Sequence, residues 1–174
     1  MKSGRPAEDE YAEYAKSDID FVQGDDAVAA LRMQETIVID YFDSFTEEAA
    51  NGLTYAQGKW TLKQVLGHLV DDERVFQYRA LCIARGDERP LAGFDENDYM
   101  AASNFESRTI EDLLAEYRAV RHATVTLFAG LPEEAWSRRG SANGHEVTVR
   151  GLAFHIAGHE LHHLRILRER YGRK

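Results

Sequence analysis

Cysteine, proline and long apolar runs are scarce in this sequence. The single cysteine, Cys82, excludes an internal disulfide and fits a reducing, cytoplasmic setting. The three prolines leave room for long uninterrupted helices. No apolar stretch approaches the ~20 residues that a membrane span needs, and residues 1–10 do not form a basic-then-apolar signal sequence. We therefore expect a soluble, cytoplasmic protein.

Positive charge is also in short supply. The chain carries 30 acidic and 21 basic side chains, which gives a formal net charge of −9. A field of that sign repels phosphate backbones and anionic lipid, so we expect no nucleic-acid partner and no membrane partner. With 174 residues, 44% of them apolar, the chain suits a single globular domain built on one core.

Apolar residues recur at helical spacing in four segments. These segments cover about residues 27–45, 62–85, 110–129 and 149–171. Thr61, with Gln64 three residues later, has the spacing of a capping box at the start of the second segment. We therefore predict an all-α four-helix bundle over residues 25–174, preceded by an arm over residues 1–24 with room for one short helix.

Two connecting segments break the helical pattern. Residues 87–108 lack a clear period, and their length predicts either a crossover or part of a site. Residues 137–144 are polar and end in Asn143-Gly144, which predicts a loop with a turn at that dipeptide.

Four of the seven histidines cluster in the last helical segment. At ~100° per residue, His163 falls on the apolar arc of the helix and His159 at the edge of that arc. His155 and His162 point toward a more polar side. Because His159 and His163 are four residues apart, their Cβ atoms stand ~5–6 Å from each other. Two imidazoles at that separation can bind one metal ion.

His68, in the second helical segment, is the candidate for a third ligand. Asp72 lies four residues on and could accept the other ring N–H of His68. Three neutral imidazoles leave an open coordination position, which suits lowering the pKa of a bound water or thiol. The alternative is that each histidine is an ordinary hydrogen-bonded core residue.

Three motifs resemble the DinB-like superfamily, close to its YfiT-like members. They are Lys59-Trp60-Thr61-Leu62, then Leu66-Gly67-His68-Leu69 with Glu73-Arg74, and finally Gly158-His159-Glu160-Leu161-His162-His163. The resemblance implies a four-helix bundle with a long crossover between its second and third helices. It also implies one divalent metal ion, zinc or nickel, on ligands that carry over to His68, His159 and His163.

The resemblance also suggests an activity. Characterised relatives include thiol S-transferases that use bacillithiol, glutathione or similar thiols, and many other relatives are described only as metal-dependent hydrolases. We therefore expect a metal-dependent thiol S-transferase acting on small electrophiles. The alternatives are a hydrolase with a metal-bound water as nucleophile and a non-catalytic metal-binding stress-response protein.

The resemblance further implies a homodimer. Ile37, Ile39 and Phe128 lie beside the main apolar stripes, where an interface could use them.

Several other residues are candidates for the site. Glu160 or Glu73 could act as a catalytic base, whereas the structural alternative for Glu73 is an ion pair with an arginine such as Arg79. His155, one turn before His159, could support the ligands. His145 could contact substrate if its loop folds over the bundle.

We interpret two further residues as structural. Trp60 precedes the second helical segment, and we interpret it as a packing anchor rather than as a surface on which substrate binds. Cys82 is too far along the same helix from His68 to bind the same ion, at ~1.5 Å per residue.

Overall fold

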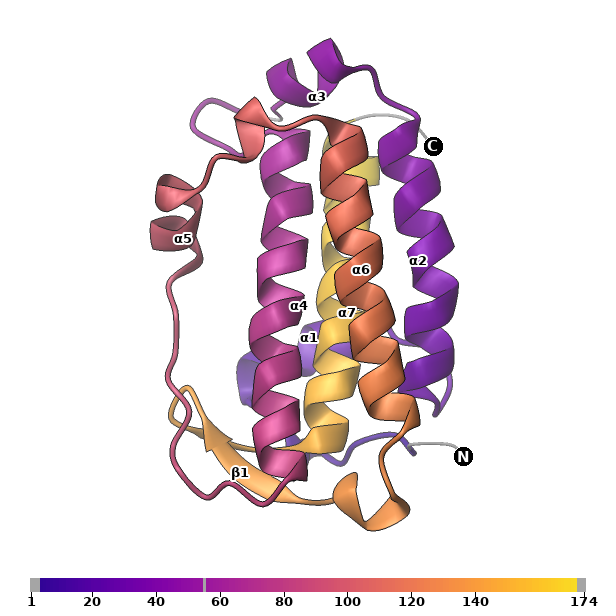
Figure 1. Ribbon diagram of the computed structural model, residues 1–174, viewed down its shortest axis with the longest axis vertical. Coiled ribbons are helices and arrows are strands. Elements are labelled where there is room, and N and C mark those ends of the chain that lie inside the picture. Colours follow the sequence, from indigo (N-terminus) through magenta and orange to yellow (C-terminus); the bar gives the residue numbers. More distant parts are fainter. Residues whose placement is uncertain (1–3, 55, 172–174) are drawn as a thin grey trace.

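The computed structural model describes residues 4–54 and 56–171, and four long helices form its core (Figure 1). These helices are α2 (Ala27–Asp43), α4 (Leu62–Ala84), α6 (Ile110–Ala129) and α7 (Val149–Arg170). The predicted four-helix bundle is confirmed, and each helix ends within two residues of its predicted boundary. None of the described helices is both long and apolar enough to cross a bilayer.

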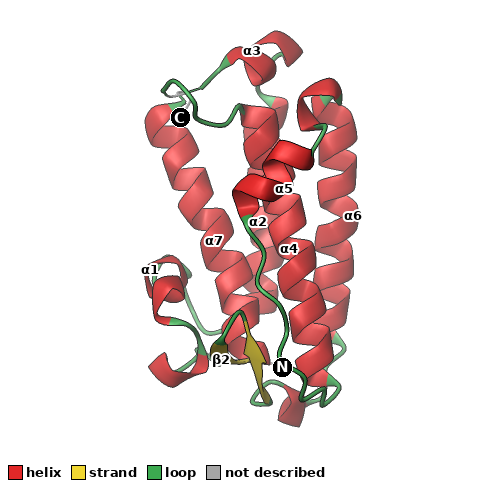
Figure 2. Cartoon of the chain, turned by 90° about the vertical axis from the view of Figure 1, so that its left-hand side faces the viewer, coloured by secondary structure: helices red, strands yellow, loops and turns green. Residues whose placement is uncertain are grey.

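The helix directions explain the long connection between α4 and α6. In Figure 1, α2 and α7 run upward, whereas α4 and α6 both run downward. Because α4 and α6 are parallel, the chain must travel back along the bundle between them. Residues 85–109 make this return and contain the short helix α5 (Glu96–Ala102) and a 3-10 turn at Phe105–Ser107. The predicted crossover is therefore confirmed, and Figure 2 shows it passing in front of α4.

A side-chain oxygen caps the first turn of every long helix. Thr61 accepts a hydrogen bond from the Gln64 N–H, and the Gln64 side chain accepts one from the Thr61 N–H at 2.8 Å, which completes the predicted capping box. The other three caps are Asp26, Thr109 and Thr148. Each such cap stabilises a helix by about 0.5–2 kcal/mol.

A small hairpin replaces the polar loop that we predicted over residues 137–144. Strands β1 (Arg139–Ala142) and β2 (His145–Thr148) pair antiparallel. Asn143 and Gly144 have φ angles of 52° and 76°, the left-handed values of a tight hairpin turn. The turn was predicted correctly, but the loop was not, because the turn brings its flanking residues into register. Leu91 of the crossover exchanges backbone hydrogen bonds with Ser141 and Asn143.

The N-terminal arm packs against α7. It contains 3-10 turns at Glu8–Glu10 and Glu13–Ala15 and the short helix α1 (Lys16–Ile19). The arm buries four apolar side chains in the core: Ala12, Ala15, Ile19 and Val22. Gly158 of α7 permits this contact, because a Cβ at that position would lie 2.3 Å from the Asp18 backbone oxygen. The arm and the bundle therefore share one core.

The remaining short helical elements lie in connections. Helix α3 (Glu47–Gly52) precedes the loop to α4, and a 3-10 turn at Glu133–Ala135 follows α6.

A polar layer divides the apolar core into two clusters. Each long helix contributes one buried polar residue to this layer: Gln34, Glu73, Arg121 and Glu160. On every helix, the apolar residues before and after this position belong to different clusters. Leu31 and Val38 illustrate this on α2, where Gln34 separates them.

One part of the predicted dimer surface is wrong. Phe128 is 1% exposed and stacks on Trp136, with ring centroids 5.6 Å apart, so it belongs to the core. The 3-10 turn after α6 brings Trp136 back over the helix, which the helical pattern alone did not reveal. Ile37 and Ile39 are half-buried against the core, and the dimer itself stays a prediction.

The contact between the arm and α7 can be tested with Gly158→Ala. The added Cβ would meet the Asp18 backbone, so we expect a loss of about 1–3 kcal/mol in the free energy of unfolding, as for other overpacked sites. Urea unfolding measures this loss. The matched control is Gly52→Ala in α3, where nothing lies within 4 Å of the added Cβ. Equal effects of the two substitutions would contradict the arm contact.

Candidate metal centre

Three histidine side chains from two helices converge on one point. His68 comes from α4, and His159 and His163 come from successive turns of α7. The Nε2 atom of His159 lies 3.2 Å from Nε2 of His68 and 3.0 Å from Nε2 of His163. One ligand atom from each residue lies within 4.8 Å of the other two. The structure thus brings together the three predicted ligands.

The protonation state of these side chains suits metal binding. Burial lowers the pKa of His68 to about 4 and, together with the neighbouring imidazoles, lowers that of His163 to about 3. The pKa of His159 is also lowered, by burial first and then by His163 and His68. Neutral imidazoles are the form that binds a metal ion.

Asp72 orients His159 rather than His68. We expected Asp72 to accept a ring N–H from His68, but its Oδ2 lies 3.2 Å from Nδ1 of His159. The carboxylate therefore reaches across to α7 instead of back along α4. A proton on Nδ1, the nitrogen that faces the Asp72 carboxylate, leaves His159 with only a lone pair at Nε2.

A metal ion satisfies this arrangement better than hydrogen bonds between the rings. The single Nε2 lone pair of His159 would otherwise have to accept a proton from both His68 and His163. A cation at the common point accepts one lone pair from each ring. It would also favour the anionic form of Asp72, whose pKa burial raises to about 8. The donor set therefore fits a divalent metal ion.

Glu73 and Glu160 lie in the polar layer, and neither lines the cavity of about 370 Å³ that opens beside the three histidines. Arg121 donates to Glu73 at 2.7 Å and to Glu160 at 2.7 Å, both from Nη2. It also donates to the Leu31 backbone oxygen at 2.9 Å, and Tyr117 donates to Glu160 at 2.7 Å. Glu73 and Glu160 are 3% and 2% exposed. The structure thus supports the ion-pair alternative for Glu73, with Arg121 as its partner instead of Arg79, and gives no support to either glutamate as a base.

The other candidate histidines lie around the ligands. His155 is buried, with its ring 4.5 Å from that of Phe76 and 6.2 Å from that of His159. His162 lies closer to solvent, with Nδ1 3.2 Å from an Asp18 carboxylate oxygen. His145 is exposed on β2, 5.4 Å from the Tyr14 ring, and does not line the cavity beside the ligands.

A cavity of about 370 Å³ opens beside the three ligands. Its wall includes residues from the arm, the crossover and the hairpin, which the sequence analysis did not assign to the site. They are Tyr14, Asp18, Phe94, Glu96 and Asn143, together with Arg79 of α4. No motif signal in the sequence marks these positions, since all of them except Arg79 depend on how a connecting segment folds back over the bundle.

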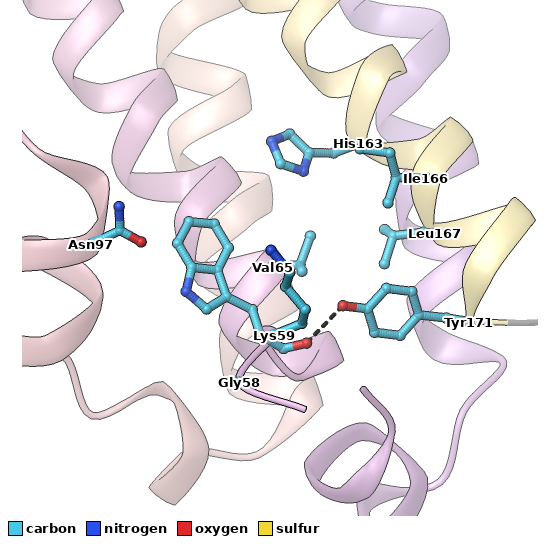
Figure 3. A pocket seen from close by; sticks show the side chains of 9 residues that line it. Gly58, Lys59, Val65, Asn97, His163, Ile166, Leu167 and Tyr171 are labelled. Atoms are coloured by element: carbon cyan, nitrogen blue, oxygen red, sulfur yellow. Dashed lines mark hydrogen bonds between the residues drawn. The ribbon is translucent and has the colours of Figure 1, made fainter. Parts of the chain in front are cut away.

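Trp60 packs against the core, as its interpretation as a packing anchor expects, and it also lies beside the three histidines. Its ring lies 4.9 Å from the His68 ring, and it lines the cavity. Trp60 and His163 also line a second cavity of about 250 Å³ (Figure 3). Val65, Ile166 and Leu167 give that second cavity an apolar wall.

The sequence profile of the DinB superfamily matches residues 30–167. The chain therefore belongs to the DinB superfamily, as the motifs around the three histidines indicated. No curated protein matches the sequence.

Among solved structures, the chain is similar to YfiT from Bacillus subtilis. The TM-score is 0.74 at 17% sequence identity, and the match covers 94% of this chain and 89% of that one. YfiT is described as a probable metal-dependent hydrolase with an unusual four-helix bundle topology. This likeness confirms the fold.

Substitutions of single histidines test the ligand assignment. Purified His68→Ala, His159→Ala and His163→Ala proteins should each lose most bound zinc or nickel, because each removes one of three donors. The loss should exceed the ~10–100-fold that loss of a supporting residue typically costs. Plasma emission spectrometry measures the metal content. His162→Ala is the matched control and should retain metal, since Nδ1 of His162 faces Asp18 and its ring packs edge-on against His163 without joining the three-histidine group. The reverse pattern would contradict the assignment.

Substitution of Arg121 tests the polar layer. Arg121→Met would leave two buried carboxylates without their cation, and breaking a buried pair in this way costs about 3–5 kcal/mol. Thermal or urea unfolding should show this loss. Arg74→Met is the control, because Arg74 is exposed and its ion pair with Glu116 lies at the surface. A similar change in both variants would show that the layer does not stabilise the bundle.

Proposed function

We propose that this protein is a metal-dependent enzyme that acts on a small molecule in the cavity beside His68, His159 and His163. The observation that supports this proposal is the convergence of three neutral imidazoles at the wall of an open cavity. Structural zinc sites are normally closed by a fourth protein ligand, whereas catalytic sites keep one position open. The described residues offer no fourth histidine, cysteine or carboxylate ligand to this group.

Each residue at the centre has a separate part in this proposal. His68, His159 and His163 would hold zinc or nickel, and Asp72 would fix the tautomer of His159. Such an ion lowers the pKa of a coordinated thiol or water toward neutrality. Trp60 and His155 would shape the walls around the reacting group.

Transfer of a thiol to a small electrophile is the reaction that the cavity supports best. Pockets for small molecules usually measure ~300–1,000 Å³, so about 370 Å³ suits a tripeptide-sized thiol. In this reaction the sulfur forms a bond to carbon, the leaving group departs with its bonding electrons, and the thiol proton passes to solvent. A thiolate needs no carboxylate base, which agrees with the burial of Glu73 and Glu160.

Hydrolysis is the second candidate reaction. Asp72 favours it, because this carboxylate lines the cavity and lies within hydrogen-bonding distance of a ligand. The description of YfiT as a probable metal-dependent hydrolase agrees with this candidate. The non-catalytic alternative has less support, since the ligand set is open.

An activity comparison separates these candidates. The zinc- or nickel-loaded protein should consume glutathione in the presence of an aryl halide electrophile faster than the uncatalysed reaction, as measured by loss of free thiol. His163→Ala protein should return the rate to background, while His122→Ala protein should retain it, because His122 is exposed on α6 and does not line the cavity. Cleavage of an activated aryl ester without thiol consumption would instead assign hydrolysis. Metal-loaded protein inactive in both assays would contradict the enzymatic proposal.

A further inference from the structure

Two buried arginines in the described structure have very different surroundings. Arg121, 0% exposed, has two carboxylates and a backbone oxygen as partners. Arg79, 3% exposed, donates one hydrogen bond, from Nη2 to the Ala92 backbone oxygen at 2.7 Å. Its Nε has no hydrogen-bond partner among the described residues. No carboxylate of those residues lies within ion-pair distance of it. Asp72 interacts with Arg79 only through longer-range charge, so an anion in direct contact with this buried guanidinium would stabilise it further.

The surroundings of Arg79 hold its guanidinium at the wall of the metal-centre cavity. Arg79 lines that cavity together with Phe76 and Phe94. The guanidinium carbon lies 4.8 Å from the Phe76 ring centroid and 5.7 Å from that of Phe94. The two rings and the Ala92 oxygen fix the position of the group. A guanidinium that is already held in place loses little conformational entropy when it binds a planar anion.

We propose that Arg79 binds a carboxylate group of the substrate. This proposal rests on the proposed function, since it takes the cavity beside the three histidines to be the substrate site. Arg79 is the only cationic side chain, apart from the histidines, among the described residues that line this cavity. The substrate class is therefore a small organic acid, with its carboxylate at Arg79 and its reacting group at the metal centre.

The length of α4 sets the distance between the two ends of such a substrate. Phe76, against which Arg79 stacks, follows His68 by eight residues, or about 12 Å along the helix. A substrate that spans the cavity would thus carry its carboxylate on the order of 12 Å from the reacting atom, given the rise of ~1.5 Å per residue.

The charge of the cavity favours a monoanion over a phosphate group. Asp18, Asp72 and Glu96 also line this cavity. Their negative field opposes a dianion more strongly than a carboxylate. A monoanionic group, such as a carboxylate, therefore fits Arg79 better than a phosphate does.

Binding of hexanoate and of hexanamide to metal-stripped protein tests this assignment. The two probes share their size and apolar chain, and removal of metal prevents direct coordination of the carboxylate. We expect hexanoate to bind more tightly than hexanamide, as measured by NMR titration. Arg79→Met should weaken hexanoate binding about 10- to 100-fold, the loss expected for a hydrogen bond to a charged group. It should leave hexanamide binding unchanged, and Arg79→Lys should retain part of the preference.

A direct readout covers the case in which Arg79→Met does not fold. In the unsubstituted protein, the Nε–H resonance of Arg79 should shift on addition of hexanoate and stay in place with hexanamide. Equal binding of both probes, a preference that survives Arg79→Met, or an unshifted resonance would each overturn the proposal. Tighter binding of inorganic phosphate than of hexanoate would overturn the carboxylate assignment. Protein that binds no metal yet keeps the hexanoate preference would refute the proposed function and leave the Arg79 subsite intact.

Discussion

Arg121 and its two glutamates form the interaction on which the arrangement of the bundle depends. A fully buried guanidinium requires its partners in fixed positions, because any displaced carboxylate would leave an uncompensated charge in the core. Glu73 lies on α4, Glu160 on α7 and the Leu31 carbonyl on α2, so one side chain of α6 contacts the other three helices. Apolar contacts tolerate sliding between helices, whereas this polar layer specifies one axial alignment of all four.

The same layer determines the alignment of the metal centre. Asp72 precedes Glu73 on α4, and His159 precedes Glu160 on α7. Successive residues of a helix differ by ~100° in direction, so one member of each pair faces the cavity and the next faces Arg121. The ion pairs that align Glu73 with Glu160 therefore also align Asp72 with His159. The close contact between Asp72 and His159 beside the three histidines is thus coupled to the buried ion pairs in the core.

Local signals in the sequence were sufficient for the helices and for the shared face of His159 and His163. Thr61, Thr109 and Thr148 marked helix starts because capping depends on a few neighbouring residues. His159 and His163 were identified because spacing along one helix determines which side chains share a face. Contacts between distant segments had no such signal. The partner of Asp72, the arginine paired with Glu73 and the place of Trp60 beside His68 all depend on how helices and loops meet in three dimensions.

The parallel course of α4 and α6 has a consequence for how this protein can change. A long return segment is required by the topology, and it contributes Phe94 and Glu96 to the wall of the cavity. The three histidines, by contrast, lie on two helices of the bundle. Substitutions and length changes in the crossover could therefore alter which molecules enter the site without disturbing the ligands. The three histidines thus lie on helices of the bundle, whereas part of the cavity wall lies on a segment whose sequence and length can change. Relatives could therefore differ in the molecules that they bind while they keep the same three histidines.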